Sequence, residues 1–404
     1  MAMIRIHSSA GVYEVHCARG VLWRARALIA RAVGDATGVF VVSSPRVWRA
    51  CGREVARALG ISPRRAILFD DREAAKRLAT VEKIASALVR VGADRHCVVI
   101  AVGGGVVGDV AGFAAATYLR GVRLVHIPTT LVAQVDSAIG GKTGVDLPEG
   151  KNLVGAFYPP KLVIADPNLL RTLPHREYRS GLYEVIKYGV IADAKLFEFL
   201  ATNMNVVLRR DPEAVDWIIQ RCIAIKTRVV NEDEREAGLR KILNFGHTLG
   251  HALEAATNYK RFLHGEAVAY GMVGATLLAI ATHRLDLANG HRILVAIRRV
   301  GPIPDVPRLE PSRIFSLLAS DKKSRAGKVR WVLPRDIGTT EWDATVPEDL
   351  ALRMIQGTRL MMEEMKIDDP IIAVRKPNLT PKPPATRNIV TLRMSPPRGK
   401  TSAR

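Results

Sequence analysis

The feature that most constrains the fold is an alternation of short apolar runs with helical patterns before residue 130. The apolar runs lack polar alternation, which is typical of strands buried on both faces of a sheet. Strands that alternate with helices predict βαβ units and a mostly parallel sheet. The predicted strands are 39–44, 66–70, 97–102 and 123–128. The predicted helices are 47–59, 72–91 and a stretch from the glycines after 102 to about Leu119.

The pattern changes near residue 175, where helical periodicity becomes dominant. A chain of 404 residues exceeds the roughly 250–300 residues that one core usually holds, so we expect two domains. We predict a Rossmann-like α/β domain over 1–174 and a mostly α-helical, metal-binding domain over 175–364. The helical patterns cover 182–190, 196–208, 215–230, 242–256 and 267–285, and 320–334 resembles a hairpin. The basic, proline-rich segment 365–404 predicts a disordered tail.

The composition excludes several classes of protein. The formal net charge of +21 is compatible with a nucleic-acid binder, but the charges are dispersed and rich in arginine, which favours a solvated surface around an enzyme. We expect no membrane span, because no apolar run is long enough. Four scattered cysteines and an N-terminus without a secretory pattern predict a reducing cytoplasm.

The run AVGGGVVGDVAGF at 101–113 holds the spacing G-x-G-x-x-G at Gly103, Gly105 and Gly108. Glycines between a strand and a helix let backbone N–H groups approach a pyrophosphate. The run follows the third predicted strand rather than the first, and an acidic residue about 20 positions later is missing. Asp109 follows the last of these glycines instead. The spacing alone leaves a nucleotide site and a tight turn equally open.

Three further clusters carry candidate chemistry. Asp136, Lys142, Lys151 and Asn152 lie in a glycine-rich segment, 128–157, that is too apolar for an ordinary surface loop and suits an anion. Glu184 and Lys187 are three residues apart on a predicted helix with apolar neighbours, which favours a buried pair.

The third cluster contains three histidines within 18 residues. His247 and His251 lie four residues apart on one predicted helix face, and His264 opens the next helix. Such spacing suits a transition metal that takes a further carboxylate ligand. The spacing does not decide whether His251 ligates a metal or contacts a substrate.

Together these clusters resemble the 3-dehydroquinate synthase family. The segments that carry the resemblance are GGGVVGDVAGFAAATYLRG, PTTLVAQVDSAIGGKTGVDLPEGKNLVGAFYPPK, RTLP, GLYEVIKYG, LNFGHTLGHALEA, LHGEAVAYGM and DKK. They run in order from about residue 35 to 350. The resemblance implies the dehydroquinate synthase-like fold, tightly held NAD, one divalent metal (zinc, with cobalt as an alternative) and a homodimer.

The resemblance also implies an activity and a set of site residues. The activity is conversion of 3-deoxy-D-arabino-heptulosonate 7-phosphate to 3-dehydroquinate and phosphate by transient oxidation, elimination, reduction, ring opening and an aldol step. The implied metal ligands are Glu184, His247 and His264. The implied substrate contacts are Arg120, Asp136, Lys142, Asn152, Lys187, Lys226, Arg240, Asn244, His251 and one of Lys322 and Lys323. The implied cofactor contacts are Glu73, Lys76, Gly103, Gly104, Gly105, Asp109, Thr129, Thr130, Lys142, Lys151 and Thr172.

Other functions remain as alternatives. A sugar-phosphate cyclase such as 2-epi-5-epi-valiolone synthase would share the glycine run and the metal ligands. Lys226, Asn244, His251 and the Lys322–Lys323 pair match the dehydroquinate synthase pattern instead. A metal-dependent dehydrogenase of the glycerol dehydrogenase type would not need the phosphate-binding lysines. Nucleic-acid binding has only the net charge and the tail in its favour.

Overall fold

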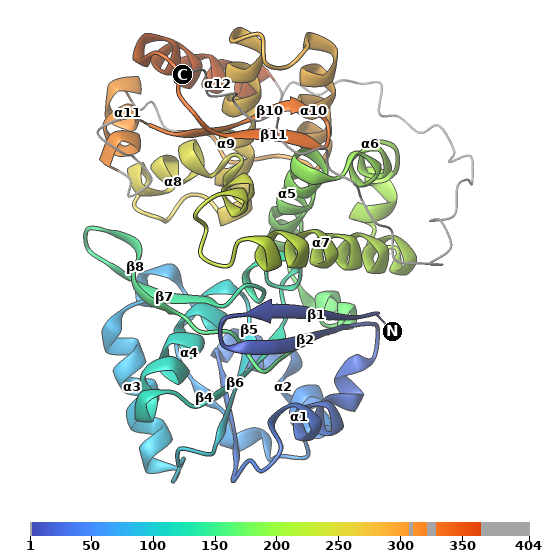
Figure 1. The fold of residues 1–404 in the computed structure, drawn as a ribbon, viewed down its shortest axis with the longest axis vertical. Helices are drawn as coiled ribbons and strands as arrows, with labels where there is room; N and C mark the ends of the chain where they lie inside the picture. Colours follow the sequence, from blue (N-terminus) through green and yellow to red (C-terminus); the bar gives the residue numbers. More distant parts are fainter. Residues whose placement is uncertain (1, 307–309, 321–328, 365–404) are drawn as a thin grey trace, which may run out of the picture. The chain divides into compact units, whose positions relative to one another are not determined.

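A seven-stranded sheet organises the N-terminal half of the computed structural model, which describes residues 2–306, 310–320 and 329–364 (Figure 1). The strand order is β1-β2-β9-β6-β5-β3-β4. All neighbours pair in parallel except β1, which forms an antiparallel hairpin with β2. The strands are β1 (Ala2–Ser8), β2 (Gly11–Cys17), β3 (Val39–Ser43), β4 (Ile67–Leu68), β5 (Val98–Gly103), β6 (Arg123–Pro128) and β9 (Leu162–Ala165). The predicted mostly parallel sheet is confirmed.

The central strand β5 shows why this sheet needs helices on both faces. Val98, Ile100 and Val102 belong to one apolar cluster, whereas Val99 and Ala101 belong to another on the opposite face. Complete burial of a valine or isoleucine side chain contributes about 1.5–3 kcal/mol to folding. The helices of the first cluster are α1 (Ala25–Val33) and α2 (Pro45–Leu59), and those of the second are α3 (Leu78–Arg90) and α4 (Gly105–Thr117).

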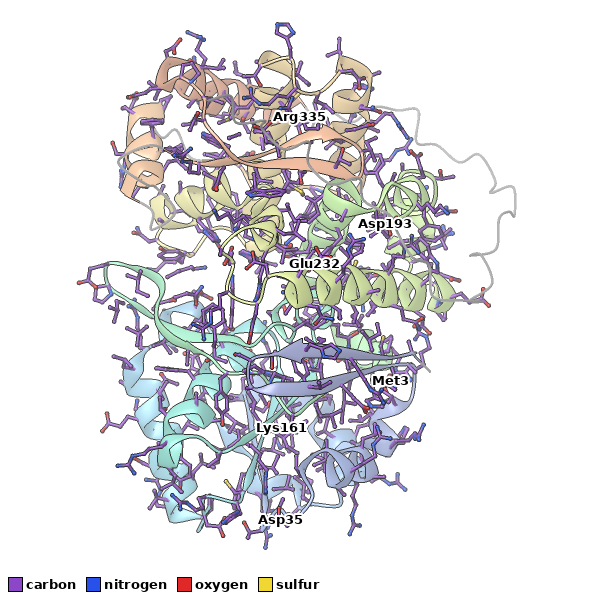
Figure 2. All side chains as sticks on the ribbon, viewed as in Figure 1. Met3, Asp35, Lys161, Asp193, Glu232 and Arg335 are labelled. Carbon is purple, nitrogen blue, oxygen red and sulfur yellow. The ribbon has the colours of Figure 1, made fainter. Side chains whose placement is uncertain are left out.

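Helices dominate the chain after residue 174, as predicted. They are α5 (His175–Ala192), α6 (Ala194–Leu208), α7 (Pro212–Glu232), α8 (His247–Ala256), α9 (His264–Ala281), α10 (Leu287–Arg299), α11 (Pro311–Ser320) and α12 (Glu348–Glu364). The nearly all-apolar α9 is central and packs against α5, α8, α10 and α12. Asp193, labelled in Figure 2, caps α6 by accepting hydrogen bonds from the N–H groups of Lys195 and Leu196. Among the described residues, no helix combines the length and the apolar character required to cross a bilayer.

The structure corrects several predicted boundaries. The helix predicted from residue 72 begins at Leu78, because Glu73–Ala75 form a separate 3-10 turn that ends beside the buried Lys76. The helix predicted over 242–256 is broken, since the 3-10 turn Leu239–Asn244 precedes α8. The helix predicted over 267–285 instead spans 264–281 as α9.

The hairpin predicted within 320–334 lies further along the chain. β10 (Trp331–Asp336) pairs with β11 (Thr339–Ala344), so the turn comes after the predicted strand rather than before it. The described residues all belong to one compact unit by their contacts. The domain boundary predicted at residue 174 stays a prediction. The predicted tail, 365–404, lies outside the described residues.

His126 on β6 gives the fold an expected pH dependence. Its side chain is buried, and burial lowers its pKa from 6.5 to about 4. As the pH falls below 6.5 the unfolded chain binds a proton that the folded chain does not bind, so stability falls between pH 6.5 and about 4. Near pH 5 this loss amounts to about 2 kcal/mol.

We therefore expect His126→Leu, compared with the unsubstituted protein, to lose about 2 kcal/mol less stability between pH 7 and pH 5. Urea unfolding at both pH values measures this difference, and comparing pH-induced losses cancels any packing cost that is independent of pH. Equal losses in the two proteins would show that His126 is not responsible.

Candidate active site

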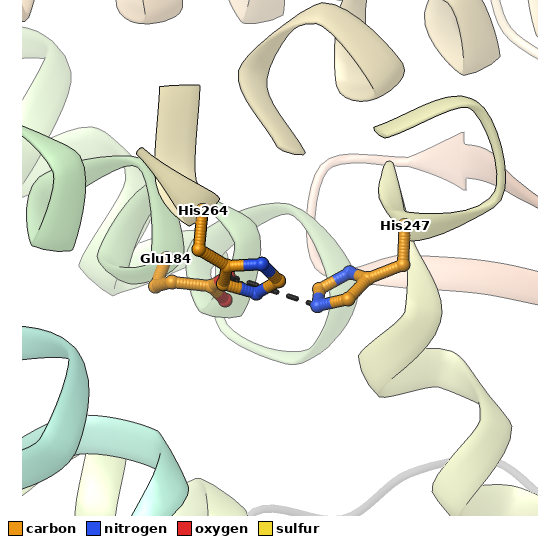
Figure 3. Close-up of side chains that lie close together, drawn as sticks. All are labelled: Glu184, His247 and His264. Atoms are coloured by element: carbon orange, nitrogen blue, oxygen red, sulfur yellow. Dashed lines mark ion pairs between the residues drawn. The ribbon is translucent and has the colours of Figure 1, made fainter. Parts of the chain in front are cut away.

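Three side chains distant in the sequence converge in the helical half. Glu184 lies on α5, His247 begins α8 and His264 begins α9 (Figure 3). The Nε2 atoms of His247 and His264 lie 3.7 and 3.3 Å from Oε1 of Glu184. Two atoms bound tetrahedrally to one zinc ion, at about 2.1 Å each, lie about 3.4 Å apart. The spacing of these groups therefore fits a metal ion.

The surroundings of the triad also fit a cation. Oε1 of Glu184 is buried and accepts no hydrogen bond of normal geometry from the described residues. Burial is the largest single influence and raises the pKa of Glu184, but Lys187 and His264 together lower the pKa below its ordinary value, which favours the ionised carboxylate. Burial opposes the charge of His264, but the carboxylates of Glu184 and Glu254 raise its pKa to about 10. A carboxylate with two imidazoles is the donor set of many catalytic zinc sites.

Two glycines bring the helices of this triad together. Gly246 has φ of +80° and turns the chain into α8, one residue before His247. A Cβ atom on Gly271 of α9 would lie 1.7 Å from the carbonyl oxygen of Gly246, so no other residue fits there. The backbones that carry His247 and His264 are therefore in direct contact.

A group of buried cations lies beside the triad. Lys187 is within 2.5 Å of Oε2 of Glu184, which confirms the predicted buried pair. Lys226 on α7 donates to both the carbonyl and the carboxylate of Asp136, and Tyr188 donates to the same carboxylate at 2.7 Å. Burial alone would raise the pKa of Asp136, but Lys226 and Lys187 hold it well below its usual range. Burial lowers the pKa of Lys226 to about 8 despite this pairing.

Two further cations, the half-exposed Lys142 and the buried Arg240, extend this group. Lys142 forms an ion pair with Glu236, to which Asn244 also donates a hydrogen bond at 2.5 Å. Arg240 is buried, and its guanidinium donates to the carbonyl of Gly140 at 3.1 Å. Lys142, Lys187, Lys226 and Arg240 are called the basic cluster below.

The glycine run lies at the carboxyl end of β5. The chain leaves β3 toward β4 and returns to β5 on the other side of β3, so the strand order reverses between β3 and β5. Ligands of open α/β sheets bind at the carboxyl ends of such strands. Gly103–Gly105 join β5 to the N-terminus of α4, and Gly103 accepts a hydrogen bond from the N–H of Thr129 at 2.9 Å. A Cβ atom on Gly104 would lie 3.0 Å from Thr130.

The predicted cofactor side chains gather around the hairpin of β7 (Lys142–Leu147) and β8 (Gly150–Phe157). Lys76 is buried and donates to Asp109 at 2.6 Å and to Asn152 at 2.5 Å. Lys151 on β8 lies 3.0 Å from Glu73. The segment 128–157 therefore contains a β-hairpin whose side chains contact other predicted cofactor residues, and its role as a binding site stays a prediction.

Two of the remaining predicted residues are exposed, whereas His251 lies beside the candidate metal ligands. Arg120 is exposed, with φ of +67°, and forms no ion pair or hydrogen bond with the other predicted site residues in the described ranges. Thr172 is exposed at the end of the 3-10 turn Pro167–Thr172. Lys322 and Lys323 lie outside the described residues. His251 has its ring centroid 5.4 Å from that of His247 and 6.0 Å from that of His264.

The sequence reasoning missed three polar residues at the site. Glu236 holds Lys142 and Asn244, but it lies in a polar stretch without a motif. Tyr188 bonds Asp136, and its position directly after Lys187 was a usable signal. Glu254 is buried beside His264, and its spacing three residues after His251 could have identified it.

The fold and the site define an α/β enzyme in which a glycine-rich strand end, a basic cluster and a candidate metal centre belong to one compact unit. Residues 66–180 match the model for the 3-dehydroquinate synthase N-terminal domain, and 181–324 match the model for the C-terminal domain. The chain belongs to the 3-dehydroquinate synthase family. A curated 3-dehydroquinate synthase from Solibacter usitatus is 47% identical over 79% of this chain and 89% of its own length.

Two solved structures of related enzymes are similar throughout. The 2-deoxy-scyllo-inosose synthase complexed with carbaglucose-6-phosphate, NAD+ and Co2+ has a TM-score of 0.79 at 28% identity, covering 88% of this chain and 99% of the other. The 2-epi-5-epi-valiolone synthase from Streptomyces hygroscopicus subsp. jinggangensis, with NAD+ and Zn2+ bound, has a TM-score of 0.76 at 31% identity, covering 87% and 97%. The dehydroquinate synthase-like fold predicted from the sequence is confirmed.

Proposed function

We propose that this chain converts 3-deoxy-D-arabino-heptulosonate 7-phosphate to 3-dehydroquinate and phosphate, with NAD and one divalent metal as cofactors. The observation that carries the proposal is the position of the basic cluster. Lys187 of that cluster pairs directly with Glu184, a candidate metal ligand. An anion held by these cations would therefore lie beside the metal. The 47% identity to a curated 3-dehydroquinate synthase supports this substrate in particular.

The basic cluster favours a phosphorylated substrate over a simple alcohol. A metal-dependent alcohol dehydrogenase needs a metal and a nucleotide site but not a further set of buried cations. Burying Lys226 and Arg240 is costly unless anions compensate for the lost hydration. Asp136 compensates for only part of this charge, and a phosphate dianion together with a carboxylate would compensate for the rest.

The chain's own residues would bind, orient and screen the reacting groups. Glu184, His247 and His264 would hold the metal, and the glycine run with Lys76, Asp109 and Lys151 would hold NAD. The metal supplies Lewis acidity and NAD supplies reversible hydride exchange. Lys142, Lys226 and Arg240 would orient the phosphate and the substrate carboxylate. The departing phosphate can act as the base for its own elimination, so the basic cluster is not required to remove that proton.

A phosphate-release assay tests the proposal and separates its alternatives. We expect phosphate release from 3-deoxy-D-arabino-heptulosonate 7-phosphate, loss of release with a strong chelator, and no net consumption of NAD. Sedoheptulose 7-phosphate and glucose 6-phosphate serve as competing substrates. Faster release from either of these would assign the chain to another cyclase activity, and no release from any of the three would exclude the cyclase function.

The proposal includes a homodimer in the cytoplasm. All four cysteines are buried and unpaired, which is compatible with a reducing compartment. Light scattering of the purified protein tests the dimer, and a monomer mass at assay concentration would contradict it. Division into domains near residue 174 is a further part of this proposal.

A further inference from the structure

We propose that Glu254 is a positioning residue that fixes the imidazole ring of His264 for metal binding. The inference rests on the proposed metal site and adds to it a carboxylate that the sequence reasoning did not select. Glu254 lies on α8, three residues after His251, and its side chain is 4% exposed. A carboxylate buried to this degree needs partners that compensate for its lost hydration.

The two ring nitrogens of His264 face two different carboxylates. Nε2 lies 3.3 Å from Oε1 of Glu184, and Nδ1 lies 3.6 Å from Oε1 of Glu254. A neutral imidazole carries one N–H group and one lone pair. If Nε2 offers its lone pair to a metal beside Glu184, the proton is on Nδ1 and points toward Glu254.

The other candidate histidine ligand has the same arrangement with a different acceptor. Nδ1 of His247 lies 3.2 Å from the carbonyl oxygen of Phe245, while its Nε2 faces Glu184. Metal-bound histidines usually donate their second N–H to a carbonyl or carboxylate, which fixes the tautomer and the ring orientation. Phe245 would perform this task for His247, and Glu254 would perform it for His264.

Lys151 holds Glu254 in place from the other half of the molecule. Its Nζ lies 3.1 Å from Oε1 of Glu254 and 3.0 Å from Oε1 of Glu73. Oε2 of Glu254 is buried and has no hydrogen-bond partner among the described residues. The row Glu73, Lys151, Glu254, His264 therefore links the hairpin of β7 and β8 to the metal centre.

Glu254 could instead be a metal ligand itself, because His251, Glu254 and His264 also have donor atoms within 4.8 Å of one another. That group shares His264 with the group of Glu184 and His247. A neutral His264 cannot donate a proton from Nδ1 and bind a second metal through the same atom. One ion at Glu184 and a positioning role for Glu254 satisfy both ring nitrogens at once.

Zinc affinity without NAD, measured by competition with a chromophoric chelator, tests the role of Glu254. We expect Glu254→Gln, which keeps the shape but removes the charge, to weaken zinc binding about 10- to 100-fold. The absorption of bound Co2+ should shift but keep the intensity of the unsubstituted site, because the number of ligands is unchanged. Failure of the unsubstituted protein to bind zinc would refute the proposed metal site and with it this inference, whereas an effect confined to the variants bears on the inference alone.

Glu266→Gln is the matched control. Glu266 is equally buried and lies on the helix of His264, but its carboxylate pairs with Arg176 and caps α9. We expect this variant to melt at a lower temperature with unchanged zinc affinity. The inference is overturned if Glu254→Gln binds zinc as tightly as the unsubstituted protein, or if both variants weaken binding equally. It is also overturned if Glu254→Gln loses as much affinity as His264→Ala, which would make Glu254 a ligand.

Discussion

Substitution of Glu184 by Gln, of His247 by Ala or of His264 by Ala is expected to abolish turnover and to weaken zinc binding by more than about 100-fold. This loss of zinc affinity exceeds the one expected from substituting a residue that only orients a metal ligand, because here a coordinating atom is itself removed. Glu184→Gln also removes the negative charge that Lys187 faces at 2.5 Å, so a buried cation is left without its partner. Zinc content after dialysis and phosphate release from the heptulosonate phosphate measure the two effects.

His291→Ala is the control for the histidine variants. His291 lies exposed on α10, so its loss should change neither the zinc content nor the rate. Full zinc occupancy in His247→Ala would contradict the assignment of the ligands. Loss of zinc in the control would show that the method reports general destabilisation.

The local sequence predicts the N-terminal fold well because its signals are local. The apolar residues of β5 are buried on both faces of the sheet. A continuous apolar run predicts such burial whichever helices cover the strand, so 97–102 can be recognised as a buried strand from the sequence alone. The break before α8 was not predictable in this way. Residues 242–256 are helical in composition, but the chain must turn at Gly246 so that Gly271 can contact it. That requirement comes from α9, which lies later in the chain.

Some residues of the candidate site are likewise predictable from local spacing, whereas others are recognised only by contacts between distant parts of the sequence. Histidine spacing indicated a metal but left the role of His251 open. The spacing shows which side chains share a helix face, but it does not show which groups that face contacts in the fold. In the structure Glu184 faces His247 and His264, whereas Glu254 lies between His264 and the hairpin residue Lys151. Glu236 has no sequence motif, and its importance comes entirely from its contacts with Lys142 and Asn244. Partners separated by about a hundred residues are fixed by the tertiary fold and not by spacing.

Lys142→Ala is expected to lose turnover while retaining its metal, which separates the basic cluster from the metal centre. Removal of one preorganised group that stabilises developing charge typically lowers kcat about 10²- to 10³-fold. Lys142 contacts Glu236 and none of the three candidate metal ligands. Zinc content should therefore stay at the level of the unsubstituted protein, and phosphate release at saturating substrate measures the rate.

The exposure of Lys142 makes this experiment interpretable. Its side chain is 47% exposed, so the ion pair with Glu236 contributes only about 0–1 kcal/mol to stability and the melting temperature should change little. Lys83→Ala on α3 removes another exposed lysine, one that is not a predicted site residue, and should change nothing. A rate within tenfold of the unsubstituted enzyme would remove Lys142 from the phosphate site. A lowered melting temperature with loss of zinc would mean that Lys142 holds the hairpin in place, and its charge would then have no separate role in the reaction.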